Sequence, residues 1–179
     1  MALIIGLSGD MSSGKGTVAK YFRDNYGFQK VTLSDFIRLE AKKKNLIPSR
    51  DNLFKIHSEF DEIDPFYFDK KGKELIDSNK WDKVIIDGIR GNLDFYKENF
   101  EKFYLIFVTA PEEIRFKRML SRGRKTDPKT LEEFKEQEKH ETKQFNFKYL
   151  KDNADFILDN SKDLKHLYAQ IDKIIGAVG

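Results

Sequence analysis

The chain has 179 residues, of which 39% are hydrophobic and 35% are charged, and its formal net charge is only +3. This length suits one domain with a full apolar core. The near balance of charge gives no indication of a nucleic-acid or membrane partner. The chain has no cysteine, which excludes disulfides, thiolate catalysis and zinc–thiolate sites.

The distribution of apolar residues also bears on location. No run of about 18 apolar residues occurs in the chain, so no membrane-spanning helix is predicted. The first residues enter an apolar strand directly, without the basic leader and apolar core of a signal peptide. We therefore expect a cytoplasmic protein.

The first part of the chain predicts strands that alternate with helices. Residues 2–7 form a short continuous apolar run, typical of a strand buried on both faces. A glycine-rich segment follows, and helical spacing of apolar residues then predicts a helix that ends at Gly27. Residues 28–32 can form a second strand. We expect the next helix to begin at Ser34, which is a good N-cap.

The segment that follows the second strand is interrupted by prolines. Pro48 and Pro65 break it, and apolar residues between them recur at helical spacing. The aromatic residues 66–68 then precede another short helical run. We interpret residues of about 34–80 as a helical subdomain.

The second half of the chain continues the alternation. It predicts strands at 84–87, 103–108 and 156–158, helices that follow Pro111 and Thr130, and a last amphipathic helix that contains Leu164 to Ile175. Thr130 and Glu133 have the spacing of a capping box, and Gly176 is expected to end the last helix. Such alternation predicts an α/β fold of three layers, in which helices cover both faces of a parallel sheet, within a single domain of residues 1–179.

A glycine-rich loop lies between the first strand and the first helix. Glycines allow the backbone to approach a polyphosphate closely, and the helix N-terminus offers free N–H groups. Lys15 can bridge the outer phosphates. The usual pattern has Ser or Thr directly after the lysine, whereas Gly16 stands there and Thr17 follows. The sequence therefore predicts a P-loop that binds ATP through Gly9, Ser12, Ser13, Gly14, Lys15, Gly16 and Thr17.

A carboxylate follows the strand at 84–87. Ligands of open α/β sheets bind at the carboxyl ends of the strands, and a carboxylate there can hold Mg²⁺. We therefore predict that Asp87 binds Mg²⁺ together with Thr17, although Asp87 could instead cap the turn before Gly88.

Two arginines follow neighbouring strands. Arg38 comes after the second strand and Arg90 after Asp87, so together they could clamp an anionic acceptor, although each alone is as readily a surface ion pair. Asp35 could act as a general base if the acceptor is a hydroxyl, and otherwise could cap a helix or support Mg²⁺.

More arginines mark a predicted lid at about 118–130. Arg118 and Arg122 are four residues apart on a helix, so they share a face, and Arg124 follows in the loop. Arginines on a closing loop could neutralise the charge of a transferring phosphoryl group, which would give Arg122 a catalytic role. The alternative is a solvated basic helix end, which the helix dipole favours.

Several motifs resemble known kinases. The opening GLSGDMSSGKGTVAKYF resembles that of dephospho-CoA kinases, and ADFILDNSKDL resembles their adenine-side segment. That resemblance implies that Asn160 lies near the adenine base. Other segments resemble archaeal-type kinases related to both dephospho-CoA kinase and adenylate kinase, namely LSDFIRLEAKKKNLIPSRDNL, VIIDGIRG and RGRKTDPKTLEEFKEQEKHE.

A second resemblance concerns the acceptor. The letters GKGT are similar to those of adenylate kinases and other nucleoside monophosphate kinases. The Asp87-Gly-x-Arg90 motif and the segment from Asp35 to Arg38 are similar to the acceptor motifs of adenylate kinase. The resemblance implies that Arg38 and Arg90 hold an acceptor phosphate and that Arg118 and Arg122 face ATP.

Three functions remain open from the sequence. We expect an ATP- and Mg²⁺-dependent kinase of a small nucleotide, in the first place a nucleoside monophosphate. The second possibility is a dephospho-CoA kinase, and the third is an ATPase that acts as an assembly factor and needs no acceptor. Two acceptor arginines favour a kinase, because a switch does not require them.

Overall fold

The computed structural model describes residues 2–123 and 127–179. Within these residues one five-stranded sheet forms the centre of the molecule, with the strand order β2-β3-β1-β4-β5 and every pairing parallel. The strands are β1 (Leu3–Gly9), β2 (Gln29–Thr32), β3 (Lys83–Asp87), β4 (Lys102–Thr109) and β5 (Phe156–Asp159). The predicted parallel α/β architecture is therefore confirmed.

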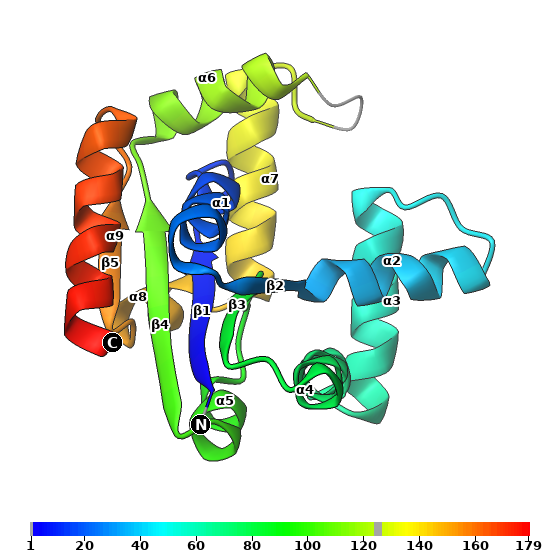
Figure 1. Cartoon of the computed structure of the whole chain (residues 1–179). Helices are drawn as coiled ribbons and strands as arrows, with labels where there is room; N and C mark the ends of the chain where they lie inside the picture. Colours follow the sequence, from blue (N-terminus) through cyan, green and yellow to red (C-terminus); the bar gives the residue numbers. More distant parts are fainter. Residues whose placement is uncertain (1, 124–126) are drawn as a thin grey trace.

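Helices cover both faces of this sheet and extend beyond one of its edges (Figure 1). They are α1 (Lys15–Tyr26), α2 (Leu33–Lys43), α3 (Arg50–Ile63), α4 (Tyr67–Asn79), α5 (Leu93–Asn99), α6 (Glu112–Arg122), α7 (Leu131–Gln144), α8 (Phe147–Asp152) and α9 (Leu164–Val178).

The strands are apolar on both faces because each face packs against a separate core. On β1, Ile4 belongs to the core covered by α4, α5 and α8, whereas Ile5 belongs to the core covered by α1 and α9. On β4, Leu105 and Ile106 divide in the same way. This arrangement explains the continuous apolar runs, since side chains point alternately to the two faces of a strand.

Helices α2 and α3 form a mass beside the β2 edge of the sheet (Figure 1), and α4 packs against both this mass and the sheet. They share a small core of Ile37, Ala41, Ile56 and Phe68. The expected N-cap was wrong: α2 begins at Leu33, and the Ser34 hydroxyl accepts a hydrogen bond from Arg38.

Other element ends are explained by local chemistry. The predicted capping box of α7 is present, since Thr130 and Glu133 each accept from the other's backbone N–H. Gly176 does not end α9, which continues to Val178 because Ile174 and Val178 pack into the core. Among the described helices, none has the length and hydropathy that a bilayer crossing needs.

Candidate active site

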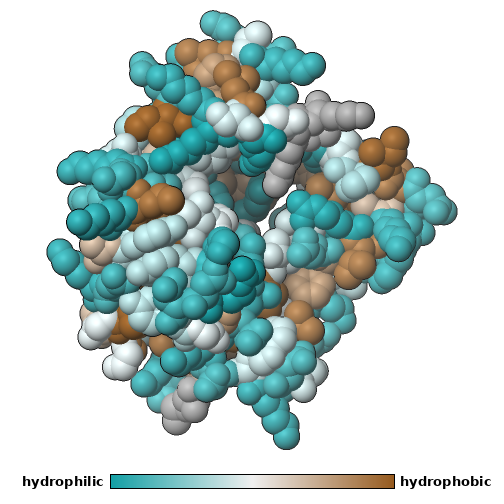
Figure 2. Space-filling view, turned by 45° about the horizontal axis from the view of Figure 1, so that its top comes forward, coloured by the Kyte–Doolittle hydropathy of each residue, from teal (hydrophilic) through white to brown (hydrophobic). Residues whose placement is uncertain are grey.

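A cleft of about 2030 Å³ opens at the carboxyl ends of the strands. Figure 2 shows it as a hollow between the main body and the smaller mass of α2 and α3. Most of the residues singled out from the sequence line it: Ser12, Ser13, Gly14, Lys15, Gly16, Thr17, Asp35, Arg38, Asp87, Arg90, Arg118 and Arg122. Gly9 and Asn160 are not among the lining residues, but Gly9 accepts a hydrogen bond from Lys15 and Asn160 donates one to Ser13. The fold therefore brings the predicted residues together.

The phosphate loop depends on two glycines with positive φ. Gly9 has φ of 140°, and a Cβ there would lie 2.1 Å from the Val108 carbonyl oxygen. Gly14 has φ of 105°, and its Cβ would lie 2.2 Å from Asn160 Nδ2. Any side chain at either position is therefore both strained and obstructed. Helix α1 starts immediately afterwards, at Lys15.

Lys15 is turned back over its own loop. Its Nζ donates hydrogen bonds to the carbonyl oxygens of Gly9 (2.7 Å) and Asp10 (2.9 Å). Burial lowers the pKa of Lys15 to about 8, against the attraction of Asp87, and the positive charge of Arg90 contributes to this lowering. A bound phosphate group would offset the cost of burying the Lys15 charge, because it supplies an opposite charge nearby.

Two serines of the loop have unused hydrogen-bonding capacity. The hydroxyl oxygens of Ser12 and Ser13 are buried and have no hydrogen-bond partner among the described residues. A buried hydroxyl without a partner is costly unless something else satisfies it. Both hydroxyls lie on the loop that cradles the cleft, so an anionic ligand is a chemically suitable partner.

Asn160 and Arg118 hold the loop in place through hydrogen bonds. The Asn160 Nδ2 donates to the Ser13 carbonyl oxygen (2.7 Å). The Arg118 Nη2 donates to the Asn160 carbonyl oxygen (2.9 Å), and Nη1 reaches the Ser13 carbonyl oxygen at 3.4 Å. The loop, α6 and the segment after β5 are thereby joined by a single hydrogen-bonded group.

Arg122, at the end of α6, is held by a carboxylate. Its Nε and Nη2 donate to the two oxygens of Asp127, at 2.9 and 2.8 Å. A bidentate pair of this kind fixes the guanidinium in one orientation. Arg124, also expected in the lid, lies outside the described residues.

Asp87, at the end of β3, forms an ion pair with Lys30 of β2 at 2.7 Å. Both side chains and Thr17 line the cleft. A hydroxyl and a carboxylate suit Mg²⁺, which retains several waters and binds phosphate oxygens as well. The described residues contain no cluster of three or more His, Cys, Asp or Glu that could bind a metal without such help.

The residues of α2 that face the cleft form a small hydrogen-bonded group. Arg38 Nη1 donates to Asp35 Oδ1 (2.7 Å) and to Ser34 Oγ (2.8 Å). Both charged side chains are exposed, so this pair contributes little stability and can exchange for a ligand.

Arg90 differs from the other arginines of the cleft. Its guanidinium lies over the Phe145 ring, 4.4 Å from the centroid. It forms no hydrogen bond or ion pair with the residues that the structure describes. Its side chain is exposed to the solvent of the cleft. The protein that surrounds the cleft nevertheless reduces its hydration, and this lowers the pKa of Arg90. It is therefore a cation available to an anionic ligand.

Sequence reasoning missed several residues of the cleft. Arg50 of α3 and Glu141 of α7 form an ion pair across it at 2.9 Å, and His57 lines its wall, hydrogen-bonded to Asp61. One signal could have identified Arg50: it occupies the first turn of a helix, where a cation opposes the dipole. The other residues gave no such signal, because their roles depend on tertiary contacts.

Comparison with known proteins defines the family. The profile of a family described as an AAA domain matches residues 5–146. A UPF0200 protein of Pyrobaculum aerophilum, PAE1629, is 30% identical over 98% of this chain and 98% of its own. A UPF0200/UPF0201 protein of Archaeoglobus fulgidus is 30% identical over 96% of this chain, which spans only 54% of that relative.

Solved structures share the fold. TT1252 from Thermus thermophilus superposes with a TM-score of 0.69 at 18% identity, covering 99% of this chain and 98% of its own. Shikimate kinase from Bacteroides thetaiotaomicron does so with a TM-score of 0.60 at 15% identity, covering 98% and 97%. The chain thus has the fold of P-loop kinases. It belongs to the AAA domain family, and its full-length relatives place it among the UPF0200 proteins.

Proposed function

We propose that this protein transfers the γ-phosphoryl group of ATP to a small nucleotide, in the first place a nucleoside monophosphate. The observation that carries the proposal is Arg90. It lines the cleft without an ion-pair partner among the described residues, and it is close enough to Lys15 to lower the pKa of that lysine. A second anion-binding group beside the phosphate loop is what a phosphate acceptor requires.

The phosphate loop would bind the ATP phosphates. Lys15 would exchange its two carbonyl partners for the outer phosphates, and the Ser12 and Ser13 hydroxyls would gain acceptors. Mg²⁺ would be held by Thr17 and Asp87 with phosphate oxygens and water, and it supplies charge neutralisation. The ion pair between Lys30 and Asp87 would break when Asp87 binds Mg²⁺.

Arg90 and Arg38 would hold the acceptor phosphate from two sides of the cleft. The bond between the γ-phosphorus and the bridging oxygen breaks, and its electron pair leaves with ADP. A new bond forms to an oxygen of the acceptor phosphate. That oxygen carries no proton, so the chain needs to supply position and positive charge rather than a base.

A hydroxyl acceptor, such as the ribose of dephospho-CoA, is the alternative. Asp35 favours it, because its carboxylate lines the same cleft and could accept the hydroxyl proton. The fold likeness to shikimate kinase is compatible with it. The variant Asp35→Asn separates the two: it should nearly abolish transfer to a hydroxyl and reduce transfer to a phosphate only modestly.

The test is ADP release from MgATP in the presence of AMP, CMP, UMP, GMP, their deoxy forms or dephospho-CoA. We expect one monophosphate to stimulate release strongly, and Lys15→Ala to remove that stimulation. Stimulation by dephospho-CoA alone would indicate a hydroxyl acceptor, with Asp35 as the general base. Rapid ADP release that no acceptor alters would contradict the kinase and favour an ATP-driven assembly factor.

A further inference from the structure

Arg50 occupies an unusual position on α3. It is the first residue of the helix, whose N-cap is Ser49, and a positive charge there opposes the helix dipole. The helix therefore gains nothing from a cation at this position. Its side chain is half-buried and extends away from the helix into the cleft.

The Arg50 guanidinium contacts three separate parts of the protein around the cleft. Nη1 donates to Glu141 Oε1 on α7 (2.9 Å) and to Met11 Sδ in the phosphate loop (3.2 Å). Nη2 lies 3.7 Å from Asp127 Oδ1, in the loop between α6 and α7. Gln137 of α7 faces the same guanidinium with its amide. One side chain from the helical mass thus reaches both the loop and the lid.

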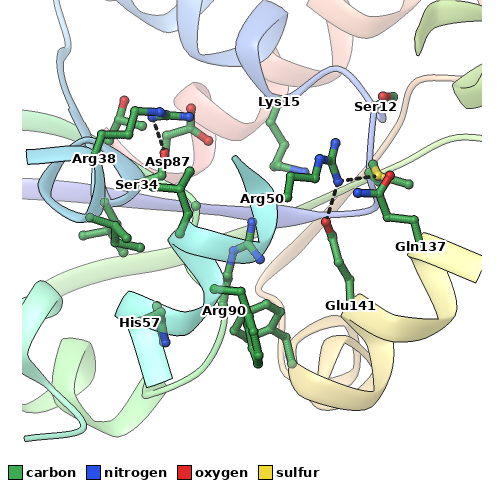
Figure 3. Close-up of a pocket in the computed structure, with 18 of the residues that line it drawn as sticks. Ser12, Lys15, Ser34, Arg38, Arg50, His57, Asp87, Arg90, Gln137 and Glu141 are labelled. Carbon is green, nitrogen blue, oxygen red and sulfur yellow. Dashed lines mark hydrogen bonds and ion pairs between the residues drawn. The ribbon is translucent and has the colours of Figure 1, made fainter. Parts of the chain in front are cut away.

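Glu141 is the ion-pair partner of Arg50 and acts at longer range on two other cations. It is hydrogen-bonded to Arg50, and its negative charge also acts on Lys15 and Arg90. Figure 3 shows Lys15, Arg50 and Arg90 directed into the same cleft from the phosphate loop, α3 and the turn after β3. Three like charges in a partly desolvated space repel one another unless an anion lies among them. Asp87 acts on Lys15 and Arg90, and Asp127 lies near Arg50, but these two carboxylates are already paired with Lys30 and Arg122. A phosphoryl group with several negative oxygens is therefore a suitable further anion for the three cations.

We propose that Arg50 is a further catalytic residue, which leaves Glu141 and binds the transferring phosphoryl group. The proposal rests on the phosphotransfer proposed above. In the transition state the bond to the bridging oxygen of ADP is breaking while the bond to the acceptor oxygen forms. Negative charge then lies on the oxygens of the transferring group and on the leaving oxygen. Arg50 neutralises that charge, whereas ground-state ATP is held chiefly by the loop.

The most direct test compares ADP with ADP–aluminium fluoride, a mimic of the transferring phosphoryl group, in the presence of Mg²⁺. Arg50→Ala should weaken binding of the mimic about 100-fold and leave ADP affinity within about threefold. Lys55→Ala removes the same charge from an exposed position of α3, and both affinities should stay at the wild-type level. Because this measurement needs no acceptor, it remains decisive even if every acceptor in the panel fails.

Turnover and rescue separate catalysis from a structural latch between α3 and α7. Arg50→Ala should lower kcat about 100-fold or more, and added guanidinium ion should restore part of it. Glu141→Gln should tighten ATP binding severalfold, because a negative charge near the phosphates is removed. If the pair of Arg50 and Glu141 only holds α3 against α7, Arg50→Ala and Glu141→Gln should both lose thermal stability and activity in parallel. Added guanidinium ion should then restore no activity. That result, or equal losses for ADP and the mimic, would overturn the proposal.

Discussion

The chemistry of single residues in the phosphate loop is set by how closely the backbone packs. Gly14 adopts φ of 105° with Asn160 Nδ2 just behind it, whereas a Cβ at Gly16 would meet nothing within 4 Å. The two glycines therefore serve different purposes, although the sequence pattern treats them alike. Gly14 permits the turn that aims the loop, and Gly16 lies open at the start of α1.

Replacing these glycines should have opposite effects on stability. Gly14→Ala should destabilise the fold by about 1–3 kcal/mol, since it adds a strained backbone conformation and a clash. Gly16→Ala should stabilise it by up to about 1 kcal/mol, because alanine favours helices. Chemical denaturation of both variants measures the two effects, and comparable losses would mean that the loop geometry is wrong.

Lys15 should make ATP binding dependent on pH. Burial lowers its pKa to about 8 in the free protein, and bound phosphates must raise it, so the complex takes up a proton above pH 8. ATP affinity should therefore fall as the pH rises beyond about 8, by up to about tenfold per unit. Titration calorimetry in two buffers of different ionisation enthalpy measures both effects.

Lys15→Arg is the matched control for this prediction. Its guanidinium stays charged over the whole range, so the decline in affinity should disappear even if binding is weaker throughout. A wild-type affinity that stays constant from pH 7.5 to about 9.5 would contradict the role assigned to Lys15.

At the scale of elements, the connection between α4 and α5 depends on a buried carboxylate. Asp69 of α4 accepts hydrogen bonds from the Tyr96 hydroxyl and from Asn92 Nδ2 at 2.8 Å. Burial raises its pKa to about 6, from an ordinary value of 3.8. The native state thus binds this proton more tightly than the unfolded state does.

The stability contributed by that proton should be complete below pH 4 and be lost as the pH rises through about 6. Its loss corresponds to about 3 kcal/mol. Asp69→Asn should remove this part of the pH dependence, so denaturation at pH 5 and pH 7.5 should show a smaller decline for the variant. Equal declines in both proteins would exclude Asp69 as the source.

The sequence predicted elements well where a periodic pattern coincided with a local signal. Gly27 ends α1, and Thr130 with Glu133 begins α7, because capping needs only neighbouring residues. It failed where tertiary packing decided the boundary. The six-residue helix α8 was not predicted, since its one buried residue, Leu150, packs into a core formed elsewhere in the chain.

The residues of the candidate site divide in the same way into those that the sequence predicts and those that depend on tertiary packing. Loop and strand-end residues such as Lys15, Asp87 and Arg90 follow from topology, because parallel strands end at one edge of the sheet. Arg50 and Glu141 lie 91 residues apart and meet only through the packing of α3 and α7 around the cleft. No local pattern could have paired them.

In the whole molecule, the cleft separates the sheet with its loop from the mass of α2 and α3 (Figure 2). The described contacts between side chains across it include the exchangeable pair of Arg50 and Glu141. We therefore expect the helical mass to move toward the loop when both substrates are bound.

Distance measurement can follow this closure, because the chain has no cysteine of its own. Dyes on Ile63→Cys in α3 and Lys165→Cys in α9 should approach each other when MgADP–aluminium fluoride and the acceptor bind. Dyes on Lys20→Cys in α1 and Lys165→Cys should keep their separation, since both helices pack on the same core. Unchanged transfer efficiency in the first pair would contradict closure.

The proposed reaction passes the γ-phosphoryl group of ATP to a nucleotide acceptor and not to water. The most direct measurement incubates ATP labelled at the γ-phosphorus with Mg²⁺ and each acceptor, and then identifies the labelled product by chromatography. We expect label in a nucleoside diphosphate, in an amount equal to the ADP formed, and no labelled product with Lys15→Ala. Label found only in inorganic phosphate, whichever acceptor is present, would contradict it.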